Sequence, residues 1–270
     1  MLIKNRKAPV MGCVAPRQSL SPARFALRSK QNGGASPSIQ DEMRALSNPK
    51  RAQILSRFFK TGPGEYAEGD QFLGLTVPQT RSMVKKYSPM PISEVKKVLH
   101  SPIHEERLAA LLILVAQFRK GDGPSQKKIY EMYLRETRYI NNWDLVDVTC
   151  EHIVGAFLSN RSREVLDCLT RSKNVWERRI SIVSTFHFIK SGYYEDTLRI
   201  SSLLLQDRHD LIQKAVGWML REVGKRCSEK ILKDFLEKYG AVMPRTMLRY
   251  SVERLKPRDR QHFMSLRKIK

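Results

Sequence analysis

The stretch NNWDLVDVTCEHIVGAFL, residues 141–158, has the pattern of an amphipathic helix that begins directly after Asn142. At about 100° per residue, one apolar stripe of this helix contains Leu145, Val146, Thr149, Ile153 and Phe157. Trp143 and Asp147 are four residues apart, so they lie side by side, about a third of a turn from the centre of that stripe. An indole and a carboxylate therefore share a face that the apolar stripe does not occupy.

Helix starts of the same kind recur at intervals of about 35 residues. They are HEERLAALLILVAQF (104–118), NVWERRISIVSTFHFI (174–189), HDLIQKAVGWMLREVG (209–224) and MPRTMLRYSVERL (243–255). Shorter helices lie between them, at SREVLDCLT (162–170) and YEDTLRISSLLL (194–205). This alternation predicts an all-α fold, a HEAT-like helical-repeat solenoid (an α–α superhelix) with a concave wall. An irregular helical bundle is the alternative, and the even spacing disfavours it.

The composition indicates the class of partner. The 270 residues include 49 Lys and Arg against 27 Asp and Glu, a formal net charge of +22, which favours nucleic acid first and an anionic membrane surface second. No apolar run is long enough to span a bilayer, so we expect no transmembrane segment. Cysteines stand alone at positions 13, 150, 168 and 227, which disfavours a disulfide scaffold or zinc site and fits a reducing compartment.

Residues 1–40 differ from the rest of the chain. They carry seven basic residues and no acidic residue, and they show no sustained hydrophobic period, which predicts a disordered basic arm. Three interpretations stay open: an organelle transit peptide, a nucleic-acid-binding tail, or an extension before a start near Met43. Residues 41–270 are the expected repeat domain, which keeps 42 of the 49 basic residues and all 27 acidic ones.

A second tryptophan also lies off its apolar stripe. In residues 209–224 the core side is expected to contain Ile212, Ala215, Val216, Met219 and Val223. Lys214, Trp218 and Arg221 gather on the opposite side. Because Trp143 and Trp218 occupy corresponding points of repeats about 75 positions apart, a solenoid would place both on one surface. The alternative is that each indole fills a groove between neighbouring repeats. Trp176 lies within the apolar stripe of its own helix and is expected in the core.

Arg179 shows the opposite anomaly, because it projects into the middle of an apolar stripe. A partly buried guanidinium needs a carboxylate or a phosphate partner. Asp147, one repeat earlier, is a candidate, and so is a phosphate of DNA. A structural salt bridge to Glu151 or Glu177 is the alternative.

Metal and nucleotide sites are not expected. His100 and His104 have the spacing of zinc ligands, but Pro102 between them interrupts the helix that would align them. The chain has no GxGxxG or GxxxxGK[ST] motif that would hold a nucleotide cofactor. The segment TGPGEYAEGDQFLGLTVPQTR, residues 61–81, is dense in Gly and Pro and is predicted to be a structured turn with the capacity to contact a ligand.

Several long blocks, in this order, resemble the AlkD-type DNA glycosylases, a family of HEAT-like repeat proteins that excise alkylated purines. The resemblance covers the chain from about residue 43 to the end. The blocks are KTGPGEYAEGDQFLG, SPIHEERLAALLILV, YINNWDLVD, WERRISIVSTF, DLIQKAVGWMLREVGKR and MPRTMLRYSVERL.

The resemblance implies roles for particular residues. Asp147 would be the catalytic carboxylate, and Trp143 and Trp218 would flank the lesion nucleotide. Arg179 and Arg221 fall where the family places arginines that contact DNA. The other DNA-binding candidates on the concave face are Lys214, Arg178, Arg245 and Thr76. Thr76 departs from the family pattern, because the best-known members carry a glutamine there.

The implied activity is that of a monofunctional alkylpurine glycosylase of base excision repair. It would hydrolyse the N-glycosidic bond of cationic N3- or N7-alkylated purines in duplex DNA without deep base flipping, with Trp143 and Asp147 facing the DNA. We expect no cofactor, no membrane association, no obligate protein partner and a monomer. A cytoplasmic location at a bacterial nucleoid is expected, with organelle targeting by the arm as the alternative. The rival functions are a non-catalytic binder of damaged or distorted DNA and a protein-interaction scaffold.

Overall fold

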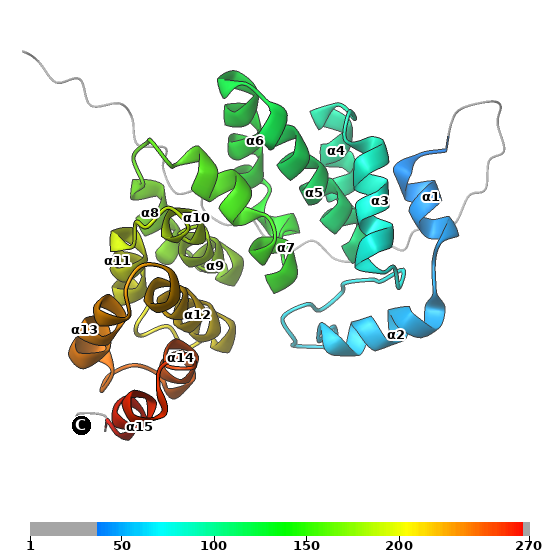
Figure 1. The fold of residues 1–270 in the computed structure, drawn as a ribbon. Coiled ribbons are helices and arrows are strands. Elements are labelled where there is room, and N and C mark those ends of the chain that lie inside the picture. Colours follow the sequence, from blue (N-terminus) through cyan, green and yellow to red (C-terminus); the bar gives the residue numbers. More distant parts are fainter. Residues whose placement is uncertain (1–36, 267–270) are drawn as a thin grey trace, which may run out of the picture. The chain divides into compact units, whose positions relative to one another are not determined.

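A computed structural model describes residues 37–266, and every regular element within that range is a helix (Figure 1). The first elements are α1 (Ile39–Ala45), α2 (Pro49–Phe58), α3 (Val77–Tyr87), α4 (Ile92–Leu99), α5 (His104–Lys120), α6 (Gly123–Arg135), η1 (Thr137–Tyr139), α7 (Trp143–Asp147) and η2 (Glu151–Gly155). The remaining ones are α8 (Glu164–Thr170), α9 (Val175–Val183), α10 (Phe186–Ile189), α11 (Glu195–Leu203), α12 (Asp210–Arg226), α13 (Glu229–Tyr239), α14 (Arg245–Ser251) and α15 (Pro257–Ser265). Within residues 37–266, one isolated β-bridge pairs Gln71 with Ile103.

The predicted repeat is confirmed. Its five expected helix starts correspond to α5, α7, α9, α12 and α14, and the shorter helices between them are α8 and α11. These five helices pack on one another in chain order, α5 on α7, α7 on α9, α9 on α12 and α12 on α14 (Figure 1). Helices α8, α11 and α13 pack against the same layer. Each repeat therefore covers the apolar face that its neighbour leaves open, as a solenoid requires.

The apolar stripes face the core as expected. All five residues predicted for the core side of α12 are fully buried, and Trp176 of α9 is buried as well. Full burial of one such aliphatic side chain contributes on the order of 1.5–3 kcal/mol to the free energy of unfolding. The off-stripe face of α12 is thereby left to Lys214, Trp218 and Arg221, which are only half-buried.

The helix expected from Asn142 onward is not continuous. Helix α7 ends at Asp147, and after a short turn the chain forms η2, a π-helical turn. The hydroxyl of Thr149 donates to the Leu145 carbonyl, and Gly155 approaches the next repeat so closely that a Cβ there would lie 2.4 Å from the Ser184 carbonyl oxygen. The π turn thus keeps the predicted stripe buried while it accommodates this close approach.

The segment between α2 and α3 is a structured loop. It contains residues 61–76 of the segment that was predicted to be a loop, residues 61–81. The buried carboxylate of Glu105 accepts hydrogen bonds from the backbone N–H groups of Leu73, Gly74 and Leu75, at 3.0, 2.8 and 3.2 Å. Gly74 has a φ of 81°, in the left-handed region that favours glycine. From residue 77 the predicted loop is instead helical, since Thr76 caps α3.

The beginning of the described fold lies close to the expected domain boundary. Ser38 caps α1, which begins at Ile39, two residues before the boundary expected at residue 41. The rest of the predicted arm, residues 1–36, lies outside the described residues. None of the helices between residues 37 and 266 is both long enough and apolar enough to cross a membrane.

Candidate functional site

A pocket of about 550 Å³ lies where the repeat layer meets the end of α2 and the loop that follows it. Its walls consist of Phe58, Lys60, Tyr66, Trp143, Arg179, His209, Asp210, Leu211, Lys214, Trp218, Arg221 and Tyr250. This lining combines aromatic rings with four Lys or Arg side chains and one carboxylate. Such a lining suits an anionic ligand with flat rings, and nucleic acid is one.

Both off-stripe tryptophans line this pocket, so the structure brings them together. The Trp143 indole Nε1–H donates to the Tyr66 hydroxyl at 3.2 Å, and its ring stacks on Phe59 with a centroid distance of 5.4 Å. Trp218 packs against Phe186 at 5.9 Å. Contacts of this kind restrict the rotamers of both indoles, so the wall of the pocket is formed before any ligand arrives.

Asp147 is largely buried, which corrects the prediction that its carboxylate is exposed and faces DNA directly. Its carboxylate binds Arg179 through two hydrogen bonds, from Nε and Nη2, each 2.7 Å long. The Asp147 side chain is 15% exposed and that of Arg179 is 6% exposed. Arg179 lines the pocket while Asp147 does not, so the guanidinium covers the carboxylate.

Of the partners proposed for Arg179 within the protein, the structure selects Asp147. Glu151 is instead paired with Lys190, and Glu177 accepts a hydrogen bond from Thr137. The remaining donor, Nη1 of Arg179, binds the backbone carbonyl of Leu211 on α12. The guanidinium therefore joins α7, α9 and α12, three successive repeats.

The charge state of Asp147 depends on two opposing effects. Burial raises the pKa of Asp147 above its ordinary value, and the nearby charge of Asp144 raises it further. The Arg179 guanidinium lowers it through its charge and its hydrogen bonds. A bidentate guanidinium pair at 2.7 Å requires an acceptor on both oxygens, so this geometry corresponds to the ionised carboxylate.

The other predicted DNA-binding residues divide into two groups. Lys214 and Arg221 line the pocket, and each has an acidic partner, Asp210 at 2.7 Å and Glu253 respectively. The hydrogen bond to Asp210 raises the pKa of Lys214, which keeps this amine charged.

The second group lies outside the pocket lining. Arg178 is paired with Asp207 at 2.7 Å, and Arg245 donates to the Met264 carbonyl at 2.8 Å. The Thr76 hydroxyl is engaged in the N-terminal cap of α3.

Sequence periodicity missed seven of the twelve lining residues. Phe58 and Lys60 lie at the end of α2 and just beyond it, Tyr66 lies in the loop, His209 caps α12, Asp210 and Leu211 begin α12, and Tyr250 lies on α14. The glycine-rich composition around Tyr66 was the available signal for that segment. The position of the other six in one wall results from contacts between segments that are distant in the sequence.

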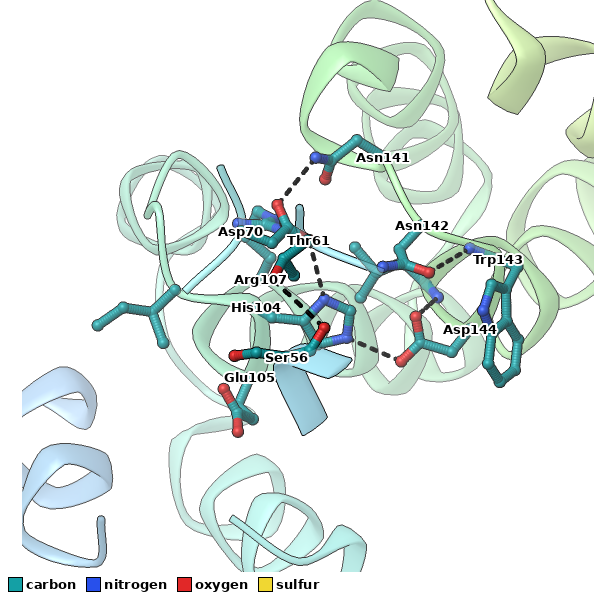
Figure 2. Close-up of polar contacts among 12 residues, drawn as sticks. Ser56, Thr61, Asp70, His104, Glu105, Arg107, Asn141, Asn142, Trp143 and Asp144 are labelled. Atoms are coloured by element: carbon teal, nitrogen blue, oxygen red, sulfur yellow. Dashed lines mark hydrogen bonds and ion pairs between the residues drawn. The ribbon is translucent and has the colours of Figure 1, made fainter. Parts of the chain in front are cut away.

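A buried polar cluster lies next to the pocket, where α5, α7 and the loop meet (Figure 2). His104, 2% exposed, places Nδ1 3.3 Å from Asp70 and Nε2 2.8 Å from Asp144. Arg107 and Asn141 also contact Asp70, at 2.8 and 3.1 Å. Burial lowers the pKa of His104, but hydrogen bonds to Asp144 and Asp70 outweigh it and raise the pKa to about 9.

The sequence contains an indication of this cluster at the start of α5, which apolar periodicity alone did not reveal. The four consecutive polar residues of the first turn of α5, residues 104–107, are all buried. Buried charged side chains are normally paired, so a charged turn at the start of an otherwise apolar helix indicates a network.

Comparisons with known proteins show the family and the fold of the chain. The family model described as "DNA alkylation repair enzyme" matches residues 39–255. A solved structure, described as a predicted DNA alkylation repair enzyme from Enterococcus faecalis, has 15% sequence identity and a TM-score of 0.61, covering 78% of this chain and 97% of its own, which shows a shared fold. No curated protein sequence matches the chain. Because the family model spans most of the repeat layer and every pocket residue, the chain belongs to the DNA alkylation repair enzyme family.

Proposed function

We propose that this protein is a monofunctional DNA glycosylase acting on cationic N3- or N7-alkylated purines in duplex DNA, without extruding the base into a deep pocket. The observation that carries the proposal is the Asp147–Arg179 pair, because it holds an ionised carboxylate one guanidinium away from a pocket walled by two indoles. Family membership supports a role in alkylation repair.

The chemistry needs one carboxylate rather than two. Glycosidases usually employ a second carboxyl group as an acid that protonates the leaving group. A purine alkylated at N3 or N7 already carries a positive charge, so it leaves without being protonated. Asp147 would stabilise the oxocarbenium-like sugar and orient a water molecule, and the faces of Trp143 and Trp218 would attract the cationic nucleotide, contributing on the order of 1–2 kcal/mol each.

In this proposal, binding of DNA removes the Arg179 guanidinium from the Asp147 carboxylate. A guanidinium binds a phosphate in the same bidentate manner as a carboxylate, so a backbone phosphate in the pocket competes for Arg179. Displacement of the Nε and Nη2 donors toward the phosphate frees the Asp147 oxygens to face the deoxyribose. Lys214 and Arg221 would bind adjacent phosphates, whereas Arg178, Arg245 and Thr76 would contact DNA only beyond the pocket.

Base release from alkylated duplex DNA tests the proposal directly. Mass spectrometry should detect 7-methylguanine or 3-methyladenine released by the wild type, and Asp147→Asn should lower the rate by about 10²–10³-fold while DNA binding is retained. Asp196→Asn is a matched control, because the Asp196 side chain is 14% exposed and paired with Arg163, but it does not line the pocket. Equal rates for wild type and Asp147→Asn would exclude the catalytic role.

A non-catalytic binder of damaged or distorted DNA is the second candidate. The ion pair between Asp147 and Arg179 favours this second candidate, because the guanidinium already neutralises the carboxylate that would take part in the chemistry. This candidate predicts salt-dependent binding of alkylated duplex with no base released by any variant. The two functions are therefore separated by the same mass-spectrometric measurement.

A further inference from the structure

The cluster of Asp70, His104 and Asp144 lies outside the pocket but joins two segments that form its wall. Asp70 belongs to the loop that carries Tyr66, and Asp144 directly follows Trp143 at the start of α7. His104, on α5, contacts both carboxylates. Figure 2 shows the imidazole between them, with Trp143 beyond Asp144.

The geometry requires the doubly protonated form of the ring. A neutral imidazole has one N–H donor, whereas here each ring nitrogen faces a carboxylate oxygen. The charged groups that face one another in the cluster are Asp70 from the loop, His104 and Arg107 from α5, and Asp144 from α7. With His104 protonated, two positive charges balance two negative ones. Loss of that proton would leave a buried net negative charge.

The ring also connects to the pocket through aromatic contacts. His104 stacks with Phe72 at 4.7 Å and lies 4.9 Å from Phe59. Phe59 in turn stacks on Trp143, whose indole N–H holds the Tyr66 hydroxyl. Any movement of the loop away from α7 therefore changes the environment of two pocket residues, Tyr66 and Trp143.

We infer that His104, as an imidazolium held by Asp70 and Asp144, is the positioning residue that fastens the loop of residues 61–76 to α7 and so holds Tyr66 and Trp143 in the pocket wall. His104 does not itself touch the pocket. The attachment of the loop to α7 is a property of the protein without DNA. Only the expected effect on base release rests on the proposed function.

The fastening predicts a pH-dependent opening of the loop. Loss of the proton removes one hydrogen bond to a carboxylate and leaves the Asp70 and Asp144 charges facing each other across the ring. The loop should then open near the pKa of His104, about 9, rather than near the ordinary histidine value of 6.5. Histidine ring signals followed by NMR from pH 5.5 to 10.5 give this midpoint, with His104 assigned from its loss in His104→Gln.

Cleavage by a glutamate-specific protease measures the opening. Glu65 and Glu68 are exposed in the loop, so cleavage there reports on loop release without any assay of activity. His104→Gln should be cleaved about tenfold faster than the wild type at pH 7, and wild-type cleavage should rise as the ring titrates. His100→Gln is the matched control, because His100 also pairs with a carboxylate, Glu136, but contacts neither the loop nor the pocket.

The outcomes are distinguishable. A His104 midpoint near 6.5, or equal cleavage of wild type, His100→Gln and His104→Gln at pH 7, overturns the inference. If circular dichroism shows that His104→Gln is unfolded, the test uses the wild type alone. Wild-type cleavage that does not rise with the titration of the His104 ring also overturns the inference.

Base release adds the functional readout. His104→Gln should weaken lesion release about tenfold through a higher KM, with kcat less affected, because the walls of the pocket are displaced while Asp147 stays in place. A wild type that releases no base contradicts the proposed glycosylase but leaves the NMR and cleavage results, and hence the inference, intact.

Discussion

Replacing His104 by glutamine should change how the stability of the protein depends on pH. The pKa of His104 is about 9 in the folded protein against 6.5 for an ordinary histidine. Because the folded-state value is the higher one, the stabilisation is fully present below pH 6.5 and is lost as the pH rises through about 9. The difference between the two values corresponds to about 3 kcal/mol, at 1.36 kcal/mol for each pKa unit. The ring is only 2% exposed, so screening by solvent does not reduce this figure much.

Urea denaturation followed by circular dichroism at pH 6, 8 and 10 measures this effect. The quantity to compare is the free energy of unfolding of the wild type minus that of His104→Gln. This difference should be about 3 kcal/mol larger at pH 6 than at pH 10. Other groups that titrate in this range, such as tyrosines and lysines, are common to both proteins and cancel in the difference. His100→Gln is the matched control, because His100 lies outside the cluster of Asp70, His104 and Asp144. A wild-type advantage that is constant from pH 6 to 10, or that grows with pH, would refute the imidazolium assignment.

Two further predictions concern the loop and the pocket. Gly74→Ala should be much more destabilising than Gly64→Ala in the same urea assay. Both glycines have a positive φ, which alone costs about 1–2 kcal/mol, but a Cβ at Gly74 would lie 2.3 Å from the backbone at the start of α2, whereas a Cβ at Gly64 meets nothing within 4 Å. Glu253→Gln should tighten binding of duplex DNA about two- to fivefold at low salt, because it releases Arg221 from its half-exposed partner. Fluorescence anisotropy at two salt concentrations measures this, and a gain that persists unchanged at high salt would contradict the electrostatic explanation.

The amino-acid sequence determined the repeat and the orientation of its helices. Apolar periodicity is local, so it could be recognised within each repeat, and the interval of about 35 residues then placed successive helices in one layer. The same periodicity placed Trp143, Trp218, Lys214 and Arg221 off the apolar stripes, and all four line one pocket. Residues exposed on corresponding faces of stacked repeats must share a surface, which is why this part of the candidate site was predictable.

Only the tertiary structure decided how the polar groups are paired. The sequence left three carboxylates and a phosphate as partners for Arg179, and the packing of α7 against α9 selected Asp147 and buried it. Tyr66 joined the pocket through a loop whose path depends on Glu105, a residue more than 30 positions away. Charge pairing between distant segments depends on distances of a few ångströms and on burial. Periodicity carries no information on either, so these contacts exist only once the repeats are stacked.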